Sequence, residues 1–123
     1  MDPKIMIIDD EEDFIDLTAT MLRFHDLDVD AVTDPREVHE KLQAQKYALI
    51  VTDLMMPHID GFTVVDQTRK MDQYKTTPII VLTAKTLTEE ERKRLHQHDV
   101  HFLVKPFEPQ GLVDLIRNLL DGG

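Results

Sequence analysis

The sequence predicts an α/β fold of the (βα)₅ type: a single doubly wound domain with a five-stranded parallel sheet. Three observations support it. Apolar runs of three or four residues recur along the chain, and such short runs are typical of strands buried on both faces. Helical patterns separate the runs. Most runs end directly before an acidic, hydroxyl or ammonium side chain, and the carboxyl ends of parallel strands form the ligand-binding edge of such a sheet.

The first strand is expected at residues 4–8, where an apolar run precedes two acidic residues. The first helix is expected at about residues 14–25, because apolar side chains recur there at helical spacing. Four residues mark its apolar face: Phe14, Leu17, Met21 and Phe24.

The second strand is expected at residues 28–32. The helix after it has a clear start, with Asp34 as the N-cap, Pro35 at the first helical position and Glu37 at the third. We expect this helix to cover residues 35–45.

The third strand is expected at residues 47–52, and the third helix follows the turn at Asp60 and Gly61. Apolar spacing marks this helix, with Met71 as a further candidate near its end. Its other marker residues are Phe62 and Val65.

The fourth strand is expected at residues 78–82, and Thr88 and Glu91 then form a capping-box pattern at the start of a helix. Two ion pairs are expected at (i, i+4) spacing: Glu89–Lys93 and Glu90–Arg94. Only Leu87 and Leu95 are apolar in this stretch. The helix should therefore be weakly docked, and it is either a plain exposed helix or one that moves or meets a partner.

The last strand is expected at residues 101–104, and Pro109 begins the fifth helix. The apolar residues on one face of that helix are Leu112, Leu115, Ile116 and Leu119.

The composition predicts a cytoplasmic protein with no membrane segment. A chain of 123 residues can bury about two-thirds of its unfolded surface, so we expect one domain over residues 1–123 and no output domain. No apolar stretch approaches the roughly 18 residues of a membrane span, and no signal peptide is apparent. Cysteine is absent, which is compatible with a reducing compartment. The net charge of −10 disfavours direct nucleic-acid binding, which depends on Lys and Arg at phosphates.

Five polar residues should converge at one edge of the predicted sheet. They follow the first, third, fourth and last strands: Asp9, Asp10, Asp53, Thr83 and Lys105. Any one of them is unremarkable, because an Asp after a strand is more often a turn residue or a helix cap. Three carboxylates, one hydroxyl and one ammonium together predict a site for a divalent cation and a phosphoryl group.

These residues lie in motifs that identify a family. The chain resembles the receiver domain of two-component response regulators over essentially its whole length. The resemblance implies the flavodoxin-like strand order 2-1-3-4-5 and a switch that is controlled by phosphorylation. It rests on four motifs in order: IIDDE at 7–11, DLMMPHIDG at 53–61, VLTAK at 81–85 and VKPF at 104–107.

The resemblance also implies a role for each site residue. Asp53 would be the phosphoacceptor, because a carboxylate can attack phosphorus to form an acyl phosphate. Asp9, Asp10 and Asp53, with the backbone carbonyl of Met55, would hold Mg²⁺, with Mn²⁺ as an alternative ion. Lys105 would supply a positive charge to the phosphoryl group. A cis peptide bond to the following proline would aim its ammonium group inward.

Two further residues would transmit the signal. The Thr83 hydroxyl would bond a phosphoryl oxygen, and Phe102 holds the switch-aromatic position, with a core Phe that never moves as the alternative. Lys85 should border the phosphoryl group. The implied partners are a sensor histidine kinase or a phosphotransfer protein, and a downstream protein bound through the face of the fourth helix, last strand and fifth helix.

The segment 97–101 departs from the family pattern. It lacks the glycine that usually ends the fourth helix, so His98 would need a left-handed or otherwise costly conformation. Three histidines also gather nearby: His96, His98 and His101. A zinc-like site is one interpretation, although loop histidines are usually only polar surface residues.

The sequence supports the competing functions less well. The domain would catalyse only its own phosphorylation and dephosphorylation, and so would not be an enzyme in the usual sense. A Mg²⁺-dependent phosphohydrolase with an aspartyl nucleophile would need a second acid two residues later, where Met55 stands. A nucleotide-binding domain would need a Gly-rich turn after Ile8. A vestigial site has no support, since every expected polar position is filled.

Overall fold

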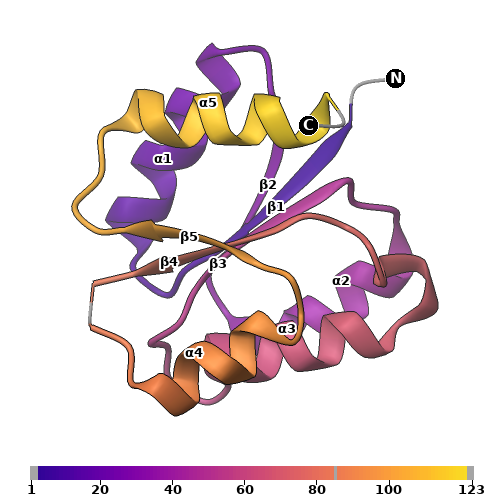
Figure 1. The fold of residues 1–123 in the computed structure, drawn as a ribbon. Coiled ribbons are helices and arrows are strands. Elements are labelled where there is room, and N and C mark those ends of the chain that lie inside the picture. Colours follow the sequence, from indigo (N-terminus) through magenta and orange to yellow (C-terminus); the bar gives the residue numbers. More distant parts are fainter. Residues whose placement is uncertain (1–2, 85, 122–123) are drawn as a thin grey trace.

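Five parallel strands form one sheet in the computed structural model, which describes residues 3–84 and 86–121 (Figure 1). The strand order is β2-β1-β3-β4-β5, so the predicted order 2-1-3-4-5 is confirmed. The strands are β1 Lys4–Ile8, β2 Asp28–Val32, β3 Leu49–Asp53, β4 Ile79–Thr83 and β5 His101–Val104. Parallel pairing places all five carboxyl ends at the same edge of the sheet.

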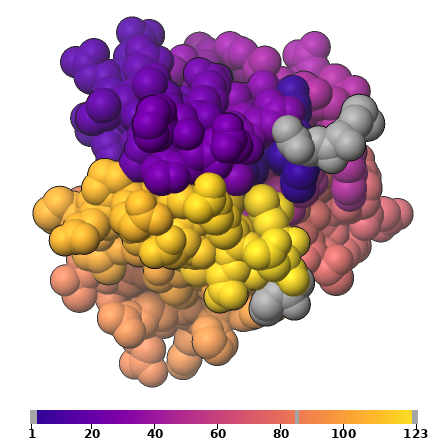
Figure 2. Space-filling view, turned by 90° about the horizontal axis from the view of Figure 1, so that it is seen from above, coloured from indigo at the N-terminus to yellow at the C-terminus, as the bar shows by residue number. Residues whose placement is uncertain are grey.

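Helices cover both faces of the sheet (Figure 1). One face carries α1 and α5, which lie side by side in Figure 2, and the other carries α2, α3 and α4. The helices are α1 Glu12–Phe24, α2 Val38–Ala44, α3 Gly61–Lys70, α4 Glu89–His96 and α5 Pro109–Leu120, with 3₁₀ turns η1 Pro35–Glu37 and η2 Asp72–Tyr74. None of the helices in the described part of the chain has both the length and the apolar character needed to cross a membrane.

The sheet separates two apolar clusters. Every residue of β3 and β4 is buried, as expected for strands covered on both faces. Alternate residues point to opposite sides: Ile50 and Val81 pack against the α2–α4 layer, and Val51 and Leu82 pack against α1 and α5. The short apolar runs of the sequence therefore form the centre of the core.

The predicted apolar face of α1 is partly wrong. Leu17 is 73% exposed and Phe24 is 83% exposed, and only Phe14 and Met21 of the predicted set pack partly against the core. The buried face is Ile15, Thr18, Ala19 and Leu22, one position along the helix. Thr18 and Ala19 of this face are small, and a search for large apolar side chains does not count them.

Other boundaries differ by a few residues, as helix ends commonly do. The helix predicted from residue 35 begins as the turn η1, which Asp34 caps by accepting a hydrogen bond from the Arg36 N–H at 3.0 Å. Met71 lies just after α3 and is partly buried against the core. The left-handed residue of the α4–β5 loop is Asp99, with φ of 54°, and not the predicted His98. Aspartate tolerates this conformation better than most residues.

Candidate functional site

The polar residues predicted to converge lie at the carboxyl edge of the sheet. Asp53 and Thr83 are the last residues of β3 and β4, and Asp9 and Lys105 directly follow β1 and β5. The register makes Asp53 the partner of Leu82 and Thr83 the partner of Val104. The strand ends are therefore level, and their side chains project into one region.

Three carboxylates form the acidic part of this region. One oxygen each from Asp9, Asp10 and Asp53 lies within 4.8 Å of the others. Asp9 is fully buried, Asp53 is 8% exposed and Asp10 is exposed to solvent. The Met55 N–H lies 3.4 Å from Asp53 Oδ1, which keeps the Met55 peptide beside the carboxylates. Because Mg²⁺ prefers hard oxygen ligands and keeps several waters, this donor set fits that ion.

Lys105 places its ammonium group between two of the carboxylates. Nζ donates to Asp9 Oδ2 at 3.0 Å and to Asp53 Oδ2 at 3.2 Å, and the side chain is only 17% exposed. The peptide bond between Lys105 and Pro106 is cis, as the family resemblance implied.

Burial and charge together act on the pKa values of Asp9 and Lys105. Burial raises the pKa of Asp9, and hydrogen bonds from the Glu11 N–H and from Lys105 offset part of that rise. Burial acts to lower the pKa of Lys105, but the hydrogen bond and charge of Asp9, followed by those of Asp53, outweigh it and raise the pKa. The ammonium therefore stays charged, and the buried Asp9 carboxylate favours a nearby cation.

Thr83 and Phe102 lie on the α4 side of the site. Thr83 is 3% exposed, whereas Phe102 is 39% exposed, so Phe102 is not a core residue in this structure. Both residues line a cavity of about 440 Å³. Leu87 and His96 contribute to the same cavity. Lys85, which sequence reasoning placed near the phosphoryl group, lies outside the described residues.

Gly61 is a site residue whose importance the sequence did not reveal. A Cβ atom built there would lie 2.1 Å from the Asp53 carbonyl oxygen and 2.7 Å from Leu54 Cα. The Gly61 N–H also donates to the Leu54 carbonyl at 2.9 Å. The start of α3 thus packs directly on the backbone that carries Asp53. The sequence pattern indicates only a turn at Gly61.

The histidines do not form a metal site. His98 Nε2 lies 2.8 Å from Asp66 Oδ1 of α3, while His96 lines the Phe102 cavity and His101 lines a different one. Within residues 3–84 and 86–121, the Asp9–Asp10–Asp53 group is the one cluster with metal-binding geometry. The zinc-like interpretation is therefore not supported.

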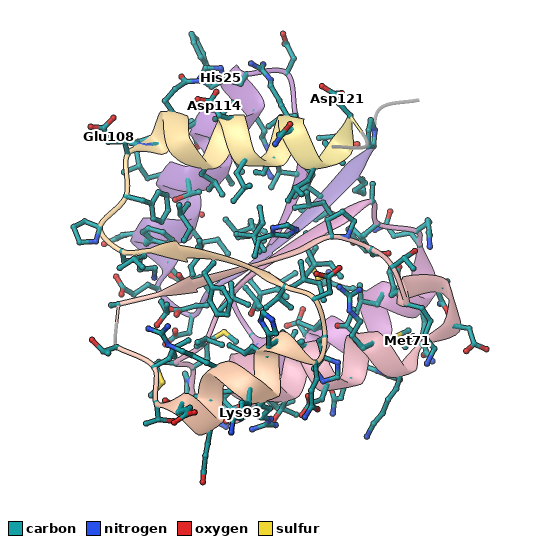
Figure 3. All side chains as sticks on the ribbon, in the orientation of Figure 1. His25, Met71, Lys93, Glu108, Asp114 and Asp121 are labelled. Atoms are coloured by element: carbon teal, nitrogen blue, oxygen red, sulfur yellow. The ribbon has the colours of Figure 1, made fainter. Side chains whose placement is uncertain are left out.

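The α4 helix is held by its cap and by polar contacts with α3. Thr88 and Glu91 form the predicted capping box, and Leu95 is the buried residue of the helix. Arg94 does not make the predicted pair with Glu90, but contacts Asp66 of α3 at 2.5 Å. The predicted pair of Lys93 with Glu89 is present at 3.8 Å, with Lys93 on the outer side of the helix (Figure 3).

This chain is similar to known proteins in both sequence and fold. The family "Response regulator receiver domain" matches residues 5–117. The response regulator ArlR of Staphylococcus saprophyticus is 36% identical over 117 residues, which cover 95% of this chain and 52% of that protein. The probable transcriptional regulator ycf29 of Porphyra purpurea is 37% identical over 92 residues, 75% of this chain and 44% of that protein.

Among solved structures, the chemotaxis response regulator CheY4 of Vibrio cholerae superposes with a TM-score of 0.88 at 29% identity, covering 96% of this chain and 98% of that one. The chain belongs to the response regulator receiver domain family of two-component systems. It spans about half the length of the curated relatives that it matches.

Proposed function

We propose that this receiver domain is a phosphoryl-accepting switch in a two-component phosphorelay. Asp53 takes a phosphoryl group from a phosphohistidine of a sensor histidine kinase or phosphotransfer protein. One observation carries this proposal: the nearly buried Asp53 carboxylate belongs to an acidic cluster suited to a cation and also accepts a hydrogen bond from the Lys105 ammonium. Receiver domains as a class act with histidine kinases, which agrees with this assignment.

The transfer step follows from the groups present. An Asp53 carboxylate oxygen attacks phosphorus, the bond from phosphorus to the donor imidazole nitrogen breaks, and the nitrogen keeps the electron pair. A cation held by Asp9, Asp10, Asp53 and the Met55 carbonyl, Mg²⁺ or alternatively Mn²⁺, would neutralise charge on the phosphoryl oxygens. Lys105 would shift its contact from the Asp53 carboxylate to one of those oxygens.

The phosphorylated form would signal through Thr83 and Phe102. We expect the buried Thr83 hydroxyl to donate to the acyl phosphate and Phe102 to leave its half-exposed position. The cavity that these residues share extends to α4, so the face made by α4, β5 and α5 would present the change to a downstream protein. Amide exchange of the apo and beryllofluoride-bound forms tests this: protection should change most between residues 84 and 102 and hardly at all over 35–45. The reverse pattern would contradict the proposed face.

We further propose that residues 1–123 constitute one receiver domain, that it works in the cytoplasm and that it makes no direct contact with nucleic acid or membrane. The absence of cysteine and the net charge of −10 support these points. It would catalyse only its own phosphorylation and dephosphorylation. The phosphohydrolase alternative is disfavoured because the position of its second acid is held by Met55, an apolar side chain that is 58% exposed.

Incubation with Mg²⁺ and acetyl phosphate, followed by intact-protein mass spectrometry, tests the proposal. The wild type should gain one phosphoryl group and Asp53→Asn should gain none, because an amide is not a competent nucleophile. Asp16→Asn, an exposed position on α1, is the matched control and should label like the wild type. Full labelling of Asp53→Asn would refute the assignment.

A further inference from the structure

The Lys105 ammonium has a third contact that the proposed chemistry does not use. Its Nζ lies 4.1 Å from the centroid of the Phe14 ring, inside the roughly 6 Å range of a cation–π interaction. The Phe14 ring meets Phe107 edge to face, with centroids 6.1 Å apart and planes at 90°. Two carboxylates and one aromatic face therefore surround the ammonium.

The aromatic contact comes from a different part of the molecule than the carboxylates. Phe14 belongs to the first turn of α1, whereas Lys105 and Phe107 lie in the segment between β5 and α5. The three side chains, with Pro106, line a cavity of about 560 Å³ beside the site. Because the side chain of Lys105 is 17% exposed, water screens the contact less than it would at an open surface.

We propose that Phe14 is a positioning residue for Lys105 during phosphoryl uptake, an inference that rests on the proposed function. Both carboxylate partners of the ammonium change their role in that reaction: Asp9 turns to the cation and Asp53 becomes the acceptor. The ring takes part in neither change, so it can hold the ammonium while the carboxylates release it. Without the ring, a released lysine side chain would regain its rotamer freedom. Fixing it again on the phosphoryl group would then cost substantial rotamer entropy.

A purely structural role for Phe14 can be distinguished from a positioning role by how the labelling rate responds to changes in the ring. Its ring is partly buried against the core cluster of α1 and α5, so removal of the whole side chain could slow the reaction by disturbing α1. Fluorination keeps the shape of the ring and withdraws the electron density that attracts a cation. The two roles therefore respond differently to fluorine.

The experiment replaces Phe14 with phenylalanine carrying one, two or three ring fluorines. The probe is acetyl phosphate with Mg²⁺, and the readouts are the labelling rate by intact mass and the thermal midpoint of the apo protein. The rate should fall stepwise with fluorine number, by about three- to tenfold in total, while the midpoint stays constant. Fluorination of Phe24, which is exposed on the same helix, is the matched control and should leave the rate unchanged.

A double-mutant comparison separates the contact between Phe14 and Lys105 from any other effect of Phe14. In a Lys105→Met background, the Phe14 series should have no further effect on the remaining rate, since no ammonium is left to hold. A flat series in the wild-type background, or an undiminished series in Lys105→Met, would overturn the positioning role while leaving Asp53 as acceptor. A wild-type protein that takes no phosphoryl group would overturn both this inference and the proposed function.

Discussion

Replacement of Gly61 by alanine should damage the fold at the point where it supports Asp53. The three atoms closest to the added methyl would all be backbone atoms. They are the Asp53 carbonyl oxygen at 2.1 Å, Leu54 Cα at 2.7 Å and the Asp53 carbonyl carbon at 2.9 Å. None of these is the end of a flexible side chain. The start of α3 must therefore move away from the end of β3.

The cost can be estimated from three contributions. Overpacking that forces a backbone shift typically costs about 1–3 kcal/mol. Weakening the hydrogen bond from the Gly61 N–H to the Leu54 carbonyl, 2.9 Å long, adds about 1 kcal/mol. Alanine also restricts the unfolded chain, which raises the free energy of unfolding by about 0.4–1 kcal/mol. The net loss is about 1–4 kcal/mol, or roughly 4–15 °C in the thermal midpoint for a domain of this size.

Thermal and urea unfolding followed by circular dichroism measures this loss. Gly111→Ala is the matched control, because a Cβ at Gly111 of α5 meets nothing within 4 Å. Gly111→Ala should be neutral or stabilise by up to about 1 kcal/mol, since alanine favours a helix. Labelling by acetyl phosphate should also slow in Gly61→Ala and stay unchanged in Gly111→Ala.

A Gly61→Ala variant that unfolds at the same temperature as the wild type and labels at the same rate would refute this prediction. That result would mean that α3 can slide away from β3 without disturbing Asp53. A loss of stability with an unchanged labelling rate would refute only the connection to the site.

Three further outcomes follow from the structure. Mg²⁺ should raise the thermal midpoint of the apo protein by relieving carboxylate repulsion, and Asp10→Ala should abolish that rise; an unchanged response would exclude Asp10 as a ligand. Asp66→Asn should speed amide exchange in α4 by about two- to fivefold, because Asp66 holds both Arg94 and His98; equal exchange would show that Leu95 alone docks the helix. The Arg36 hydrogen bonds lower the pKa of Asp34 from 3.8 to about 2, so the stabilising effect of ionised Asp34 is complete above pH 3.8 and is lost as pH falls through about 2. The midpoint difference between the wild type and Asp34→Asn should shrink over that pH range, and a pH-independent difference would contradict it.

The strand ends could be predicted from the sequence because they depend on local patterns and simple connectivity. Short apolar runs specify strands buried on both faces, and right-handed crossovers bring their carboxyl ends to one edge. Asp9, Asp53 and Lys105 lie there as expected. The capping box of Thr88 and Glu91 is equally local and was also predicted correctly.

The contacts between distant elements could not be predicted in the same way. A Cβ clash at Gly61 depends on how closely α3 approaches β3, which no local pattern encodes. Arg94 has two acidic neighbours at suitable positions, and only the packing of α4 on α3 selects Asp66 over Glu90. Phe14 was assigned to an apolar face, but its contact with Lys105 requires knowledge of where α1 meets the last loop.

The face of α1 shows a related difficulty. Large apolar side chains at positions 17 and 24 suggested the buried side of the helix, yet both are mostly exposed. The buried side instead carries Ile15, Thr18, Ala19 and Leu22, because burial depends on which face of the helix packs against the sheet. The prediction therefore identified the helix correctly and misjudged its rotation.

Chemical mapping of the phosphorylated residue tests the central claim most directly. Borohydride reduces an aspartyl phosphate to homoserine, and peptide sequencing by tandem mass spectrometry then locates the modified position. After labelling with acetyl phosphate and Mg²⁺, homoserine should be found at position 53 and nowhere else. Homoserine at Asp9 or Asp10 in place of Asp53, or its absence from a labelled protein, would contradict the account.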